Sequence, residues 1–187
     1  MFIQTESTPN PATLKFLPGQ TVLESGVADY TAATEAENSP LASRIFAVEG
    51  VTAVFLGSDF VTVTKADNID WNHLKPAILG AIMEHFQSGD PAIIAGEEQG
   101  GHSAHDDGPD AEIVRQIKEL LDTRVRPAVA QDGGDITFHG FEQGVVYLHM
   151  KGACAGCPSS TMTLKMGIEN LLRHYIPEVT EVRPVAA

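Results

Sequence analysis

The chain has 187 residues with 12 basic and 25 acidic side chains, which gives a formal net charge of -13 at pH 7. This charge argues against nonspecific binding to nucleic acid or to anionic membranes, because both need positive charge on the protein. The length suits one sizeable domain or two small ones, and the patterns described below favour two.

No apolar run in the sequence approaches the ~20 residues that a membrane-spanning helix needs, and we see no signal peptide. The chain has two cysteines, which fits a reducing compartment. We therefore expect no membrane partner. We also expect a cytoplasmic protein, or a mitochondrial one if the sequence is the mature form of a eukaryotic protein.

Residues 1–88 have the pattern of a small α+β domain. Four strand-like segments should form two hairpins, 2–6 with 13–17 and 51–56 with 59–64. Gly57 and Ser58 should make a two-residue loop in the second hairpin. The segment between the first hairpin and Ser39 is polar and rich in alanine, and we interpret it as a loop.

This first domain should contain two helices. One begins at Pro40 with Ser39 as its N-cap, and the other is capped by Asp70. The second helix has one apolar stripe at helical spacing, formed by Leu74, Ile78, Ile82 and Phe86.

Residues 89–109 should be a flexible linker. They have no hydrophobic periodicity and are rich in glycine and acidic residues, a composition that cannot bury enough surface to fold. His102 and His105 could bind a metal weakly, but we interpret them as solvated side chains. The predicted class is thus α+β, with two small domains joined by a flexible, acidic, Gly-rich linker.

Residues 110–187 predict the second domain, with the element order αββαβ. Asp110 should cap a helix that Pro127 breaks or restarts. Residues 132–135, Asp-Gly-Gly-Asp, could supply oxygen ligands or partner contacts, but we favour a turn with positive φ. A final helix should cover about 159–175, and a short strand within 179–185 could join the hairpin described next.

A hairpin of residues 136–141 and 145–150 lies at the centre of this domain. A three-residue loop would pair Phe141 with Val145, His139 with Tyr147 and Thr137 with His149. In that register one face is wholly apolar and should be core: Ile136, Phe138, Val146, Leu148 and Met150. His139 and His149 could be metal ligands or proton donors, but we interpret them as surface residues on the opposite face.

Cys154 and Cys157 are the candidate site. The spacing C-x-x-C lets both sulfurs face one point, which could hold a metal or a disulfide. The loop follows a strand ending at Met150 and precedes a helix with Pro158 at a first position, where the helix dipole favours thiolate. A metal centre needs about four protein ligands. One chain supplies two cysteine sulfurs here, so two chains would supply four.

The final helix should pack on the core through apolar residues at helical spacing: Leu164, Ile168, Leu171, Leu172 and Tyr175. Met162 and Met166 could be soft metal ligands on the same helix. We favour gap-filling core residues for both, because methionine is flexible enough to fill irregular spaces.

Two stretches of this sequence resemble the Nfu family, the NifU C-terminal-like iron–sulfur cluster carriers. They are residues 131–135, Gln-Asp-Gly-Gly-Asp, and residues 152–160, with Cys154, Cys157 and the Pro-Ser-Ser that follows. Residues 2–16 resemble the start of the N-terminal domain that many members carry. The resemblance implies a [4Fe-4S] cluster bridging two subunits through Cys154 and Cys157, received from upstream assembly proteins and passed to recipient apoproteins.

We therefore expect a carrier that is not an enzyme and that forms a homodimer on cluster binding. Its first domain would dock clients or delivery partners. Two alternatives stay open, a thiol-disulfide oxidoreductase and a structural zinc site across a dimer. Three features count against the oxidoreductase. No aromatic residue directly precedes the first cysteine, a β-hairpin precedes the motif where a βαβ unit would be expected, and no repeated strand-helix alternation surrounds it.

Overall fold

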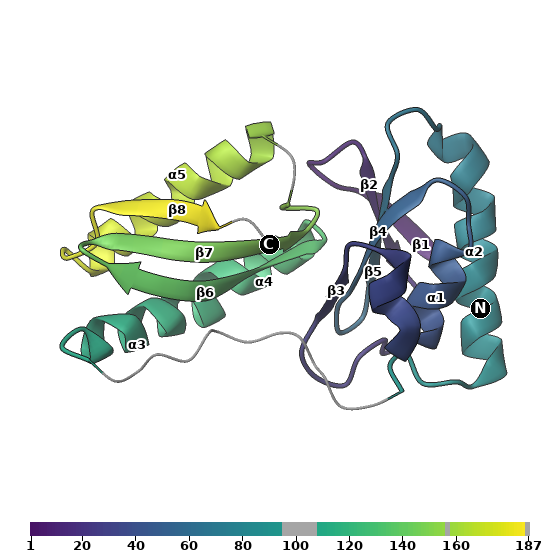
Figure 1. Cartoon of the computed structure of the whole chain (residues 1–187), viewed down its shortest axis with the longest axis horizontal. Coiled ribbons are helices and arrows are strands. Elements are labelled where there is room, and N and C mark those ends of the chain that lie inside the picture. The colour runs from purple at the N-terminus through teal and green to yellow at the C-terminus, as the bar shows by residue number, and fades with distance from the viewer. Residues whose placement is uncertain (95–107, 156–157, 186–187) are drawn as a thin grey trace. The chain divides into compact units, whose positions relative to one another are not determined.

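The computed structural model describes residues 1–94, 108–155 and 158–185, without the side chains of residues 158–161. The chain divides into two compact units, Met1–Gln99 and Gly100–Ala187 (Figure 1). Each unit combines helices with a β-sheet, so the predicted α+β class with two domains is confirmed. Most of the predicted linker, including His102 and His105, lies outside the described residues. Its flexibility and the boundaries at 88/89 and 109/110 stay predictions.

The first unit contains a five-stranded antiparallel sheet in the order β1-β2-β5-β4-β3. Its strands are β1 (Gln4–Ser7), β2 (Thr13–Leu17), β3 (Ala28–Tyr30), β4 (Val51–Leu56) and β5 (Val61–Lys65). Both predicted hairpins are confirmed. The predicted two-residue loop is wrong, because Leu56 pairs with Val61 and the Gly57 N–H donates to the Phe60 carbonyl at 2.9 Å. The short β3 was not predicted.

Helical segments of the first unit are η1 (Ala33–Asn38), α1 (Pro40–Phe46) and α2 (Trp71–Ser88). Both predicted N-caps are confirmed. The Ser39 hydroxyl accepts from the Ala42 N–H at 3.0 Å, and the Asp70 carboxylate accepts from the Asn72 N–H at 2.8 Å. These bonds satisfy backbone donors that have no partner within the helix. The 3₁₀ helix η1 occupies the segment predicted to be a loop.

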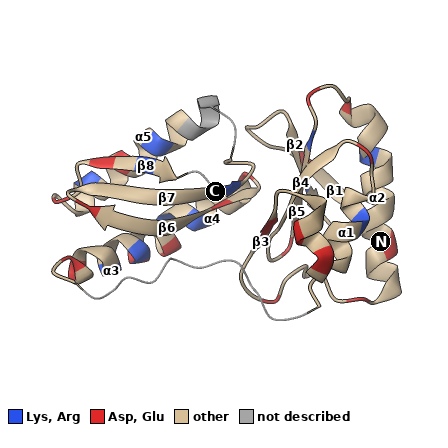
Figure 2. Cartoon of the chain, in the orientation of Figure 1, with Lys and Arg blue, Asp and Glu red and all other residues tan. Residues whose placement is uncertain are grey.

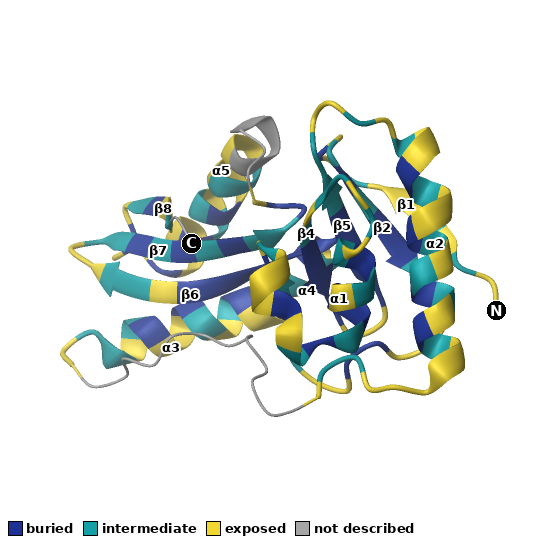
Figure 3. Ribbon diagram, turned by 45° about the vertical axis from the view of Figure 1, so that its right-hand side comes forward, coloured by how far each residue is buried: buried dark blue, intermediate teal, exposed yellow. Residues whose placement is uncertain are grey.

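The core of the first unit lies between one face of the sheet and the helices (Figure 3). The stripe predicted on α2 is buried at Leu74, Ile78 and Ile82, while Phe86 is half-buried. His85 is also buried, with 1% of its surface exposed, and its Nδ1 has no hydrogen-bond partner among the described residues. Burial, and then the charge of Arg44, lower the pKa of His85, although Asp90 opposes them.

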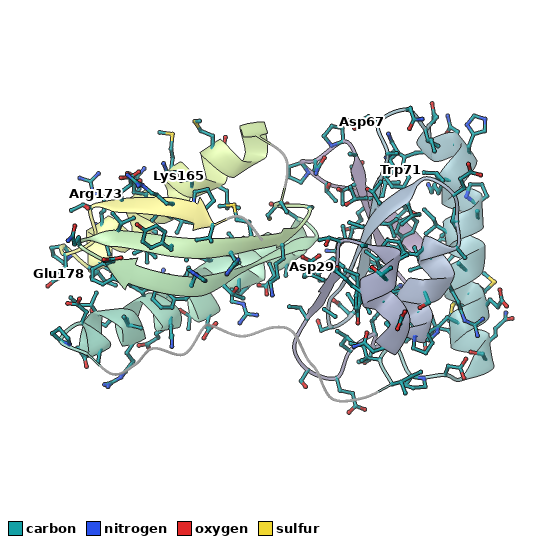
Figure 4. All side chains as sticks on the ribbon, viewed as in Figure 1. Asp29, Asp67, Trp71, Lys165, Arg173 and Glu178 are labelled. Carbon is teal, nitrogen blue, oxygen red and sulfur yellow. The ribbon has the colours of Figure 1, made fainter. Side chains whose placement is uncertain are left out.

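Trp71 begins α2 and is labelled in Figure 4. Its indole N–H donates to the Pro11 carbonyl at 3.1 Å, and the Lys65 ammonium lies 6.0 Å from the ring centroid. This hydrogen bond joins the first turn of α2 to the loop between β1 and β2.

The second unit begins with three consecutive helical segments, α3 (Ala111–Leu120), the π-helical turn η2 (Leu121–Val125) and α4 (Arg126–Gln131). Asp110 occupies the predicted N-cap position, but the side-chain cap expected there is wrong. Its side chain makes no capping hydrogen bond, and its φ and ψ of -99° and 11° are not the extended values typical of an N-cap. Pro127 does not break the helical run but restarts it, because it lies in the first turn of α4, where its missing N–H is tolerated.

The sheet of the second unit has the order β6-β7-β8, and its strands are β6 (Gly134–Glu142), β7 (Val145–Gly152) and β8 (Glu181–Val185). Strands β6 and β7 are antiparallel, but β8 runs parallel to β7. Between them lies α5 (Pro158–Tyr175), so the predicted order αββαβ is confirmed. The hairpin predicted before the cysteine loop is confirmed, but the parallel pairing also makes β7-α5-β8 a βαβ unit, which was not predicted.

The β6-β7 hairpin differs from its predicted register at one end. Gln143 and Gly144, with φ of 49° and 80°, form a two-residue loop, and a bulge inserts His139 between Phe138 and Gly140. The predicted pairs Phe141–Val145 and His139–Tyr147 are therefore wrong. Beyond the bulge the pair Thr137–His149 is confirmed. The loop is one residue shorter than predicted and the bulge adds one residue, so the two shifts in register cancel.

The predicted apolar face of this hairpin is confirmed as core: Ile136, Phe138, Val146, Leu148 and Met150 are all buried. Ile168 and Leu172 of α5 pack against it, with Leu164 and Leu171 partly buried. Tyr175 was wrongly predicted to be core. It is 47% exposed, and the Arg124 guanidinium lies 5.2 Å from its ring centroid.

Met162 and Met166 were also wrongly predicted to be core. They are 62% and 60% exposed. Each precedes a residue of the buried face, Leu164 or Ile168, by two positions. Two positions correspond to about 200° around an α-helix, so both methionines point to the opposite side. Among the described residues, no helix has the length and apolar character needed to cross a membrane.

Candidate metal centre

Cys154 lies in the turn that joins β7 to α5, and 6% of its surface is exposed. The Ala155 N–H donates to the Gly152 carbonyl at 3.1 Å, and Gly152 has a φ of 65°, so the chain reverses direction just before the cysteine. Pro158 begins α5, as predicted. Cys157 lies outside the described residues, so its position beside Cys154 stays a prediction.

The Asp-Gly-Gly-Asp segment lies against the cysteine turn. Gly133 has a φ of 82°, which confirms the predicted turn, and its carbonyl accepts from the Ala153 N–H at 3.2 Å. Gly134 allows the closest approach. A Cβ at this position would lie 2.6 Å from the Cys154 sulfur and 2.7 Å from the Lys151 carbonyl oxygen. The two sequence motifs therefore meet in space, and the second glycine makes room for the sulfur.

Asp135 is held by Arg126. The Arg126 Nε and Nη2 donate to the two carboxylate oxygens of Asp135, both at 2.9 Å, and Nη1 donates to Asp122 at 3.1 Å. Asp135 is 4% exposed, and this pairing raises the pKa of Arg126 above its usual range. Sequence reasoning missed the pair, although an aspartate at the start of a half-buried strand signals a need for a cation.

Electrostatics around Cys154 differ from the prediction of a favoured thiolate. Burial raises the pKa of its thiol to about 12, and the negative charges of Asp132 and Asp135 contribute to the rise. Desolvation penalises the charged form of the sulfur, and the two nearby carboxylates penalise it further. This environment favours the protonated thiol of Cys154, and a bound metal would have to displace that proton.

His139 and His149 lie on the face of the sheet opposite the core, as predicted. The bulge brings His139 Nδ1 within 2.8 Å of His149 Nε2, in an edge-to-face arrangement. Burial, followed by the charges of His139 and Lys151, lowers the pKa of His149. Within the described part of the chain, no three His, Cys, Asp or Glu side chains group closely enough to hold a metal.

Known protein families match both units. The model for the scaffold protein Nfu/NifU N-terminal domain matches residues 3–89, and the NifU-like domain matches residues 117–183, which include both cysteines. The chain therefore belongs to the Nfu family of NifU-like proteins, and the resemblance seen in the sequence is confirmed.

Several named relatives match almost the whole chain. It is 52% identical to NifU-like protein 4, mitochondrial, of Arabidopsis thaliana, over 97% of this chain and 65% of that protein. It is 51% identical to the human NFU1 iron-sulfur cluster scaffold homolog, mitochondrial, over 99% of this chain and 72% of that protein. The solution structure of a NifU-like protein from Saccharomyces cerevisiae also matches this chain, with 30% identity and a TM-score of 0.46. The match covers 50% of this chain and 84% of the yeast chain.

Proposed function

We propose that this chain is an iron–sulfur cluster carrier. Two copies would hold one [4Fe-4S] cluster on the thiolates of Cys154 and Cys157, receive it from upstream assembly proteins and pass it to apoproteins. The relatives support the scaffold role, since one that is 51% identical is named an iron-sulfur cluster scaffold. Because these relatives are also named mitochondrial, we propose a mitochondrial location in place of the cytoplasmic one expected from the sequence.

The observation that carries the proposal is the position of Cys154 in the turn between β7 and α5. Its sulfur is buried against Gly134, and the described part of one chain has no group of three metal-binding side chains. A four-iron cluster takes about four thiolates. Two C-x-x-C loops, one from each of two chains, would supply them.

The chain's residues would shape the site and manage its protons. Cys154 would lose its proton as the iron–sulfur bond forms, and the Gly133–Gly134 turn would leave space beside the sulfur. The Arg126–Asp135 pair would keep that turn in place. In transfer, each bond from iron to a carrier thiolate breaks as one to a client thiolate forms, so no electrons are exchanged. This exchange makes the protein a carrier and not an enzyme.

One structural observation favours a second candidate, the thiol-disulfide oxidoreductase. The C-x-x-C segment connects strand and helix in a βαβ unit, as it does in thioredoxin-like proteins. The raised pKa of the Cys154 thiol opposes this reading, because the attacking sulfur of such enzymes is a stabilised thiolate. A structural zinc site would use the same thiolates and remains a third candidate.

Anaerobic incubation of the full chain with iron and sulfide distinguishes these candidates. A carrier gives a brown protein with about one cluster per two chains, and light scattering on the same sample detects a dimer. Mössbauer spectra identify the cluster. A colourless chain that reduces disulfides in insulin identifies the oxidoreductase. A chain that takes up no iron but forms a dimer when zinc is supplied in a parallel incubation identifies the structural site.

Cysteine variants test the ligands directly. Cys154→Ser or Cys157→Ser should each abolish stable loading and the loaded dimer, since each leaves one strong ligand per chain. Ala155→Ser is the matched control, because it adds a hydroxyl at an exposed position of the same loop and keeps both thiols. A fully loaded monomer would refute the shared cluster.

A further inference from the structure

The methionines that do not join the core lie on the helix that follows the cysteines. Met162 and Met166 are 62% and 60% exposed, and they are one turn apart on α5. Large apolar side chains that are exposed next to each other often mark an interaction surface, whereas single exposed apolar residues are common and need no explanation. Methionine is also flexible and polarizable, which suits it to contact surfaces.

Asn170 extends this surface one turn beyond Met166, and Gly167 lies beside Asn170 at one edge of it, about 100° around the helix from Met166; both residues are exposed. We call Met162, Met166, Gly167 and Asn170 the methionine stripe. Glycine lowers the stability of a helix interior. No packing within the described chain requires it here, because a Cβ at position 167 would meet no atom within 4 Å. The missing side chain instead leaves room for close approach from outside.

The methionine stripe has no charged residue, although the chain has a net charge of -13. Lys165 is the first charged residue of α5, and Figure 2 colours the basic and acidic residues of the chain. Lys165 and Glu169 border the stripe. Lys165 lies 3.7 Å from Glu181, and Glu169 lies 3.9 Å from Arg173. Lys165 and Arg173 are labelled in Figure 4.

We propose that the methionine stripe is the surface on which a second copy of this chain packs when two copies share a cluster. This inference rests on the proposed function. Cys157 immediately precedes Pro158, the first residue of α5. Met162 and Met166 follow Pro158 by one and two helical turns, about 5 Å each, so a partner that brings its own cysteines to this end of α5 lies beside the stripe.

Charge favours a second copy over a client protein as the occupant. A two-fold interface brings the same residues of two chains together, so a strongly acidic chain needs an uncharged patch there. The methionine stripe meets this condition. Its border would be self-complementary in an antiparallel packing of two α5 helices centred near Gly167, which would bring Lys165 of each copy near Glu169 of the other.

A charge variant tests the stripe. Met162→Glu with Met166→Glu, loaded anaerobically, should raise the dissociation constant of the loaded dimer by about tenfold or more in sedimentation velocity. Phe2→Glu with Ile94→Glu is the matched control. It replaces two exposed apolar residues of the first unit, 79% and 63% exposed, and adds the same charge. This control should dimerise as the wild type does.

A second pair of variants tests the stripe without adding charge. Gly167→Gln should stabilise apo α5, because glutamine is the better helix former, yet weaken the loaded dimer by filling the close contact. Gly80→Gln is the control, since Gly80 is an exposed residue within α2 whose Cβ would also meet no atom within 4 Å. It should raise apo thermal stability similarly and leave the dimer unchanged.

The outcomes separate the two proposals. If the wild type forms a loaded dimer and the stripe variants dimerise with the same affinity, the stripe inference is wrong. The variants could dimerise normally and yet transfer the cluster to an apoprotein more slowly. That case assigns the stripe to clients. If the wild type itself takes up no cluster, or loads fully as a monomer, the proposed function fails first and the stripe inference fails with it.

Discussion

Arg126 donates to both carboxylate oxygens of Asp135, and each hydrogen bond is 2.9 Å long. Asp135 follows directly on the two glycines that lie against Cys154, whereas Arg126 begins α4. The pair therefore joins the start of α4 to the start of β6, where Gly134 contacts the Cys154 sulfur. A bidentate arrangement also sets the direction of the carboxylate, which a single hydrogen bond would not.

Removing Arg126 should destabilise the second unit. Arg126→Ala leaves a carboxylate that is 4% exposed without its cation, and we expect the free energy of unfolding to fall by about 2–4 kcal/mol. Urea unfolding followed by far-UV circular dichroism measures this change. Arg115→Ala is the control, because Arg115 and Glu112 form an exposed pair worth at most about 0.5 kcal/mol. Equal losses in both variants would contradict the structural role of Arg126.

Adding a methyl group at Gly134 should disturb the site. The new Cβ of Gly134→Ala would lie 2.6 Å from the Cys154 sulfur, so we expect a loss of about 1–3 kcal/mol in stability and a clear drop in cluster uptake. Gly140→Ala is the control on the same strand, where a Cβ meets no atom within 4 Å. Iron and sulfide analysis with urea unfolding measures both effects, and normal uptake by Gly134→Ala would show that the sulfur does not depend on this space.

The β6-β7 loop offers a way to stabilise the second unit. Gln143 has a φ of 49°, a conformation that asparagine adopts more easily, and Asn-Gly is a preferred pair in such two-residue loops. Gln143→Asn should raise the free energy of unfolding by roughly 0.5 kcal/mol. Gln143→Val should lower it, because a β-branched residue is strained at positive φ. Urea unfolding that ranks valine above asparagine would refute this account of the loop.

The first unit should lose stability in mild acid through His85. Burial lowers the pKa of His85 in the folded state, so the unfolded state binds its proton more readily. Stability is therefore full above the ordinary histidine pKa of about 6.5 and falls as the pH drops through that value toward the lower folded pKa. His85→Leu should flatten this slope in urea unfolding between pH 7.5 and 5. His73→Leu, at an exposed position of α2, should keep it.

Periodicity predicted most of the second unit because burial follows from spacing within an element. The alternation of Ile136 and Phe138 was sufficient to identify the core face. Met162 was predicted wrongly because the prediction followed residue type, whereas helical spacing excludes it from the core. Residue patterns also do not reveal a bulge such as that at His139, which depends on backbone geometry.

Other features of the candidate site could not be predicted because they depend on contacts between different elements of the fold. Cys154 was identified from its spacing to Cys157, but its burial against Gly134 depends on how two turns meet. The Arg126–Asp135 pair likewise joins a helix to a strand. Short-range patterns do not encode such contacts, so the raised pKa of the Cys154 thiol could not be foreseen.

Trp71 provides the first unit with an optical signal of its own. It is the one tryptophan in the chain, and its indole N–H is bonded to the Pro11 carbonyl. Unfolding of that unit breaks the bond and shifts the emission of the indole to longer wavelength. Circular dichroism at 222 nm sums the helices of both units. Recording the two signals during one titration therefore resolves the unfolding of each unit in the intact chain, without a label or a truncation.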